Sequence, residues 1–125
     1  GAQGGCQAEI GAAAAMAAAA LVELMGGSPD MAAPAVALSI MNLMGLVCDP
    51  VRGLVEVPCV YRNVAGVAVA LTSADMALAG IAPILPADEV IDASARVGQM
   101  MPAALKETGV GGCASCAAAK ECPKP

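Results

Sequence analysis

The chain has 125 residues, enough for one domain but too few for two of ordinary size. Its net charge is −5 with six Lys and Arg residues, so it lacks the basic clusters that bind nucleic acid. Histidine is absent, and metal binding would therefore depend on the six cysteines. Hydrophobic residues make up 58% of the chain but only 1% is aromatic, which indicates helices packed closely through small side chains.

Two helices are predicted in the first third of the chain. The first covers 7–25, where a run of alanines has high helix propensity and ends at two glycines. The second covers 29–46, with Ser28 as its N-cap and Pro29 at its first helical position. Pro34 fits this second helix only if it falls in the first turn.

Two more helices are predicted after a loop at 45–58, which is rich in Gly and Pro. Residues 61–80 carry small apolar side chains at helical spacing, namely Val64, Val67, Ala68, Leu71, Ala74 and Leu78. Residues 86–101 begin with Pro and acidic residues and have Arg96 near their end, as the helix dipole favours. The pattern predicts an all-α fold, a compact bundle of about four principal helices with Gly/Pro-rich connecting loops.

The most apolar stretch, 10–25, contains Glu23 and is shorter than the roughly 20 residues of a membrane span. We therefore expect no membrane partner. The first residues do not show the basic and apolar regions of a signal peptide, so we predict a cytoplasmic location. The abrupt start GAQGGC suggests part of a longer polypeptide.

The cysteines fall into two groups. One group, in loops rich in Gly and Pro, consists of Cys6, Cys48 and Cys59, and the other, near the C-terminus, of Cys113, Cys116 and Cys122. Disulfides, a zinc site and an iron-sulfur cluster all remain open for the first group. Three cysteines cannot all pair with one another, and structural zinc sites usually show two close pairs of ligands. A cluster on three thiolates leaves one iron open for substrate.

Four sequence segments carry a family resemblance. They are GAQGGCQAEIG, GLVCDPVRGLVEVPCVYRN, ALTSADMALAGI and LKETGVGG. In this order they closely resemble the C-terminal half of the catalytic alpha region of bacterial iron-sulfur-dependent L-serine dehydratases. The resemblance covers 1–112 and leaves 113–125 as a Cys-rich flexible tail. It implies part of a larger helical catalytic domain, with the remaining alpha region and a beta domain or subunit as partners in a homo- or hetero-oligomer.

This resemblance implies that Cys6, Cys48 and Cys59 hold a [4Fe-4S] cluster. The implied reaction dehydrates L-serine, with the open iron as a Lewis acid on the serine hydroxyl. A base removes the Cα proton, and hydrolysis of the resulting imine gives pyruvate and ammonia, a reaction of amino-acid catabolism and gluconeogenesis. The sequence does not identify this base, which comes either from the missing portion of the enzyme or from a carboxylate close to a ligand in sequence, such as Glu9 or Glu56.

Arg62 and Asn63 follow Cys59 directly and are candidates for binding the substrate carboxylate. The alternative is an exposed helix start with Asn63 as its cap. Asp49 is expected to shape the turn that directs Cys48.

Near the N-terminus, Gln3, Gly4 and Gly5 are expected to present polar groups and backbone N–H donors beside the cluster. Cys6 lies at a helix start, where the dipole lowers the pKa of a thiol. We expect it to converge in space with the two other predicted ligands.

The tail cysteines have three possible roles: exposed thiols, a thiolate that caps the cluster, or a separate metal or redox pair. For the whole chain, the alternative function is a non-catalytic cysteine-rich helical module that binds zinc or iron.

Overall fold

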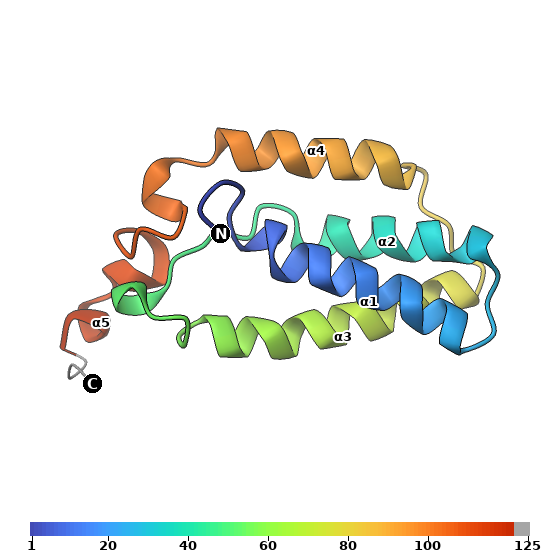
Figure 1. Cartoon of the computed structure of the whole chain (residues 1–125), viewed down its shortest axis with the longest axis horizontal. Coiled ribbons are helices and arrows are strands. Elements are labelled where there is room, and N and C mark those ends of the chain that lie inside the picture. The colour runs from blue at the N-terminus through green and yellow to red at the C-terminus, as the bar shows by residue number, and fades with distance from the viewer. Residues whose placement is uncertain (122–125) are drawn as a thin grey trace.

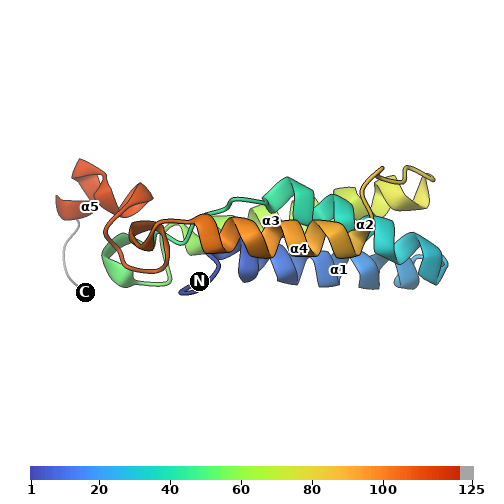
Figure 2. The same cartoon turned by 90° about the horizontal axis from the view of Figure 1, so that it is seen from above.

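Four long helices form the body of the protein in a computed structural model that describes residues 1–121 (Figure 1). They are α1 (Ile10–Leu24), α2 (Pro29–Leu43), α3 (Cys59–Leu78) and α4 (Ala87–Met100). A short helix, α5 (Ala117–Glu121), lies at the end of the elongated bundle (Figures 1 and 2). Residues 1–121 contain no strand, so the predicted all-α class and the four principal helices are confirmed.

The core forms where α1 packs against α2 and α3. Its buried residues are almost all alanine: Ala14, Ala18, Val22, Ala35, Ala70, Ala74 and Ala77. Alanine lets helices approach closely, but each side chain removes little apolar surface from water. Helix α4 packs on the outside of α2 and on the 3-10 turn η1 (Cys6–Ala8).

Helix α2 begins at Pro29, as predicted, but the expectation that the helix tolerates Pro34 only in its first turn is wrong. Pro34 is the sixth helical residue, and its ring removes the N–H that would bond the carbonyl four residues earlier. The flanking helical residues nevertheless hold the segment in one continuous helix.

Helix α3 buries a different face from the one that its bulky residues mark. The exposed fractions are 69% for Val64, 61% for Val67 and 48% for Leu71, whereas Gly66 and Ala70 are buried. The small residues face α1 and α2, since only they allow the close approach of these helices. Val64, Val67 and Leu71 therefore form an apolar surface that faces outward, whereas Ala74 and Leu78 of the predicted stripe belong to the core side.

Loops and 3-10 turns gather at one end of the bundle, beside the N-terminus (Figure 1). The loop after α2 pairs there with residues 103–107: the Cys48 N–H donates to the Leu105 carbonyl at 2.9 Å, and the Glu107 N–H to the Cys48 carbonyl at 2.8 Å. Residues 113–121, predicted as a flexible tail, form the turn η4 (Gly112–Ser115) and α5. This end of the bundle contains the predicted cysteine site.

One helical segment, Cys6–Leu24, is long and apolar enough to span a membrane by length and composition. It has 19 residues and a mean hydropathy of 1.3, and 33% of it is buried within the protein. The core helix of a soluble protein passes the same test, so this result alone assigns no membrane span.

Candidate functional site

The three cysteines of the first group come from three different elements. Cys6 lies in η1 just before α1, Cys48 in the loop after α2, and Cys59 at the first position of α3. Cys6 and Cys48 are each 6% exposed, Cys59 is half-buried, and all three are free thiols. Their elements meet at the end of the bundle where the loops gather (Figure 1), and the convergence of the three thiols on one cluster stays a prediction.

The Cys6 thiol does not have the lowered pKa that its helix-start position predicts. Burial raises the pKa of this thiol above its ordinary value, and Glu9 raises it further. The Arg62 guanidinium and the Ile10 N–H lower the pKa but do not outweigh the burial. The expectation fails because the helix-start effect is smaller than the cost of placing an anion out of water.

Two carboxylates lie beside Cys48. A Cβ atom on Gly1 would stand 2.9 Å from Cys48 Sγ, 2.9 Å from Glu107 Oε2 and 3.0 Å from Glu9 Oε1, so the three groups surround one point. Burial raises the pKa of the Cys48 thiol, and the charges of Glu9 and Glu107 add to this rise.

Sequence reasoning missed Glu107 because it is 59 positions from Cys48 along the chain (107 − 48). Its φ of 65° is unusual for a residue other than glycine, and its N–H is bonded to the Cys48 carbonyl. Its place in the LKETGVGG segment is the one signal that the sequence offers.

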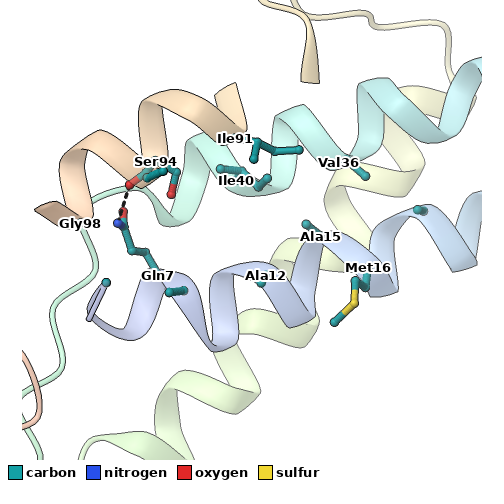
Figure 3. A pocket seen from close by; sticks show the side chains of 13 residues that line it. Gln7, Ala12, Ala15, Met16, Val36, Ile40, Ile91, Ser94 and Gly98 are labelled. Carbon is teal, nitrogen blue, oxygen red and sulfur yellow. Dashed lines mark hydrogen bonds between the residues drawn. The ribbon is translucent and has the colours of Figure 1, made fainter. Parts of the chain in front are cut away.

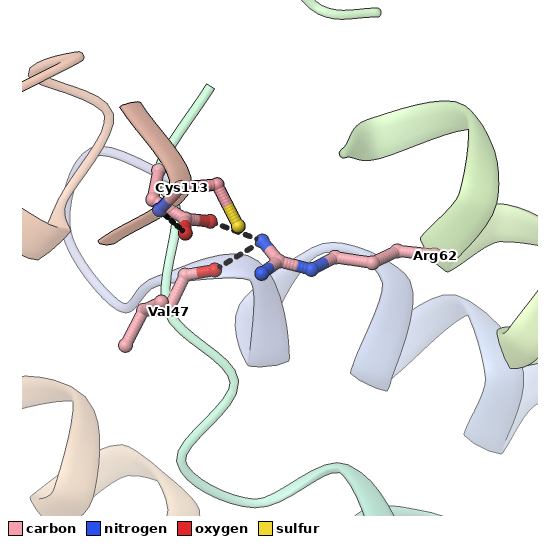
Figure 4. A network of polar contacts seen from close by, with 4 residues as sticks. Val47, Arg62 and Cys113 are labelled. Atoms are coloured by element: carbon pink, nitrogen blue, oxygen red, sulfur yellow. Dashed lines mark hydrogen bonds and ion pairs between the residues drawn. The ribbon is translucent and has the colours of Figure 1, made fainter. Parts of the chain in front are cut away.

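A polar network joins the Cys48 loop to α3 and to η4 (Figure 4). Arg62 Nη1 donates to Asp49 Oδ1 at 2.5 Å and to the Val47 carbonyl at 2.8 Å. The Cys113 N–H donates to Asp49 Oδ2 at 2.6 Å. The Asp49 side chain is 2% exposed, so its carboxylate is a buried anion with both oxygens bonded. Asp49 thus fixes the loop that carries Cys48; its expected role in directing Cys48 toward a cluster stays a prediction.

The same network decides the ionisation of Asp49. Burial by itself would raise the pKa of this carboxyl, but the Cys113 N–H and the Arg62 guanidinium lower it below its ordinary value. In return, Asp49 outweighs the effect of burial on Arg62 and raises the pKa of the guanidinium. Both groups are therefore charged at neutral pH.

The two predicted substrate-binding residues have different surroundings. One guanidinium nitrogen of Arg62 holds the Cys48 loop, and Asn63 is exposed on α3. Because α3 begins at Cys59, Asn63 is its fifth residue and not its cap. Binding of a substrate carboxylate by these residues stays a prediction.

The N-terminal loop is held against α4 and the end of α2. Gly4 and Gly98 touch closely: a Cβ on Gly98 would lie 3.0 Å from Gly4 Cα. Gly5 has a φ of +75°, and a Cβ there would meet the Leu46 carbonyl at 2.8 Å. Gln3 is exposed. Their expected role beside a cluster stays a prediction.

Gln7 is a further site residue that sequence reasoning missed. It is 5% exposed, and its amide accepts from the Gly45 N–H and donates to the Ser94 carbonyl, both at 2.8 Å. Its backbone N–H also donates to the Leu46 carbonyl at 2.9 Å. It fixes the turn next to Cys6, and a Gln directly after a Cys is the only sequence signal for this role.

The remaining candidates that the structure describes are exposed, and Cys113 reaches the group through its N–H bond to Asp49. Glu56 is exposed in the loop before α3, and Cys113 and Cys116 are exposed and free. Cys122 lies outside the described residues. Within 1–121, no three Cys, Asp or Glu side chains are grouped as ligands of a single metal ion. This finding concerns single-ion sites, whereas a cluster distributes its thiolate ligands over different irons.

Comparison with known proteins identifies relatives of this chain. The family model described as serine dehydratase alpha chain matches residues 1–114. A probable L-serine dehydratase alpha chain of Bacillus subtilis is 58% identical over 124 residues, which are 99% of this chain and 41% of the relative. A probable L-serine dehydratase alpha chain of Latilactobacillus sakei is 60% identical over 115 residues, which are 92% of this chain and 55% of the relative. The L-serine dehydratase alpha chain of Peptoniphilus asaccharolyticus is 56% identical over 91% of this chain and 39% of its own. The chain thus spans 39–55% of these relatives.

Proposed function

Because this chain belongs to the serine dehydratase alpha chain family, we propose that it is part of an enzyme that converts L-serine to pyruvate and ammonia. The observation that carries the proposal is the match along 1–114 together with three free thiols at one end of the bundle. The rest of the alpha region and a beta domain or subunit would complete the enzyme, in a homo- or hetero-oligomer in the cytoplasm. Free cysteines are typical of such a reducing compartment.

The donor set fits a [4Fe-4S] cluster held by Cys6, Cys48 and Cys59. Two of these thiols are buried, and burial raises their pKa. Without a metal Cys6 and Cys48 therefore favour the neutral thiol, and bound iron would stabilise their thiolates, as metals do for coordinated cysteine. When bound, a cluster with three protein ligands supplies an open iron that acts as a Lewis acid on the serine hydroxyl.

The chain's own residues position the ligands and the substrate. Asp49, held by Arg62 and Cys113, fixes the loop of Cys48, and Gln7 fixes the turn of Cys6. We assign Arg62 and Asn63 to the serine carboxylate, since a guanidinium matches a carboxylate with two parallel donors. Both candidate bases are exposed. The Glu9 carboxylate lies beside Cys48, where it also pairs with the N-terminal ammonium at 2.9 Å, and we therefore favour Glu9 over Glu56.

Anaerobic reconstitution with iron and sulfide tests the proposal. The complete alpha region, assembled with its beta part, should bind four irons and four sulfides and form pyruvate from L-serine. One zinc per chain with no sulfide and no pyruvate would instead establish the non-catalytic metal-binding module. An active enzyme without iron would refute the cluster while leaving the reaction in place.

A further inference from the structure

A groove of about 520 Å³ runs between α1 and α4, with α2 as its floor (Figure 3). Alanine and glycine provide most of its lining, from Gly4 and Ala8 before α1, from 12–19 in α1 and from 95–98 in α4. Its bulkier apolar side chains are Met16, Val36, Ile40 and Ile91. Met16 is 68% exposed and Ile91 is 46% exposed, so the groove is open along its length.

The polar groups at one end of the groove are already bonded within the chain. Gln7 Nε2 donates to the Ser94 carbonyl, and Gln7 Oε1 accepts from the Gly45 N–H (Figure 3). The Gln7 amide thus has its oxygen and one N–H satisfied within the chain, and the rest of the lining is apolar apart from the Ser94 hydroxyl. An occupant of the groove gains contact mainly with apolar surface.

Helix α1 has the character of a helix that is covered on every side. Its 15 residues include one charged side chain, Glu23, and apolar residues occupy its whole circumference. A helix that is hydrophobic all round belongs in a core. Only 33% of the segment is buried, however, so the groove side of α1 lacks the cover that its sequence requires.

We infer that this groove receives an α-helix from the part of the alpha chain that lies beyond the matched segment. The inference rests on the proposed function in that it takes this chain as one part of a longer alpha chain. The three relatives are about twice as long as the segment they share with this chain, or longer. The occupant is thus a neighbouring segment of the same catalytic region, with an apolar face.

The dimensions and the lining suit a helix. The lining positions on α1 run from Ala12 to Ala19, which at 1.5 Å per residue is about 10 Å, or two helical turns. Small side chains at a helix contact allow axes to approach to about 8 Å. The four bulkier apolar side chains would then pack into the grooves between the side-chain ridges of the incoming helix.

Oxidation of Met16 by hydroxyl radicals tests the inference. A complete alpha chain is made in which this chain replaces the matching segment of the Bacillus subtilis relative, and it is compared with the 125-residue chain alone. We expect Met16 to be oxidised at least tenfold more slowly in the complete alpha chain. Ala95→Trp, which fills the groove from α4, should restore rapid oxidation. Arg96→Trp, a neighbouring exposed position that does not line the groove, should leave Met16 protected.

Several results would overturn the inference. One is equally rapid oxidation of Met16 in both proteins, and another is protection unaffected by Ala95→Trp. Protection of the 125-residue chain alone, with the mass of a dimer, would assign the groove to a second copy. Protection only on addition of phosphatidylglycerol vesicles would assign it to a membrane. Iron analysis of the same samples separates the two proposals: Met16 protection without iron refutes the cluster and retains the helix.

Discussion

Replacing Asp49 by Asn removes the anion that joins the Cys48 loop to α3 and η4. The carboxylate is 2% exposed and the Arg62 side chain 17% exposed, and they are 2.5 Å apart. Loss of one partner from a buried pair costs about 3–5 kcal/mol, because the other charge stays buried without a partner. Since Arg62 retains some contact with water and Asn keeps one acceptor oxygen, we expect a loss of about 2–3 kcal/mol in the free energy of unfolding.

Urea unfolding followed by circular dichroism measures this loss on protein prepared without iron. A double-mutant cycle with Arg62→Met, which keeps the aliphatic contacts, should give a coupling energy of about 2 kcal/mol. Amide exchange at Cys113 provides a second readout, because its N–H loses a charged acceptor. A loss below about 0.5 kcal/mol, or a coupling energy near zero, would refute the role given to the pair.

The pH dependence of the free energy of unfolding of Asp49→Asn tests whether the ionised carboxylate stabilises the folded state. Because the pKa of Asp49 is lowered in the folded state, its contribution is present above the ordinary carboxyl value of 3.8 and disappears as the pH falls through the folded value. The difference in stability between the native protein and Asp49→Asn should be constant above pH 5 and shrink below 3.8. A difference that grew on acidification would contradict the ion pair.

Three further sets of substitutions, each with its control, test other parts of the structure. Alanine at any one of Cys6, Cys48 and Cys59 should abolish iron retention and pyruvate formation, whereas alanine at Cys113, Cys116 and Cys122 together should retain most of both. Gly98→Ala should lower the free energy of unfolding by about 1–2 kcal/mol, since its Cβ would meet the Gly4 backbone; Gly11→Ala, with neighbours at 3.7 Å, should raise it by up to about 1 kcal/mol. Ser73→Ala should raise it by about 1 kcal/mol, because the buried hydroxyl has no partner within residues 1–121; the exposed Ser115→Ala should change it by less than about 0.5 kcal/mol.

The helices were predictable because their signals are local. These signals favour or end a helix within one or two turns of the residues that carry them. They are an alanine run that ends at two glycines, Pro29 after Ser28, and acidic residues at the start of α4. The structure accordingly differs from the predicted bounds by only a few residues at most ends. Pro34 was misjudged because neighbouring helical residues compensate for one lost hydrogen bond.

The site was predictable only in part because its contacts join distant segments. Asp49 could be linked to the Cys48 turn from sequence, but its partners are 13 and 64 positions away. Glu107 and Gln7 were missed for the same reason, since no local pattern marks a residue whose role is a contact across the fold. The pKa of Cys6 was misjudged because burial, a property of the tertiary structure, outweighs the effect of the helix start.

The exposed apolar stripe on α3 has the same explanation as the open groove on α1. Val64, Val67 and Leu71 have the spacing of a buried helix face, and yet each is about half exposed or more. Hydrophobic spacing reflects every neighbour that a helix has in its complete domain, whereas the burial seen here reflects only the neighbours within 1–121. The side of α3 that packs on α1 uses alanine and glycine instead. Helix α3 therefore has two contact faces, and its bulkier face fits the longer alpha chain that the relatives possess.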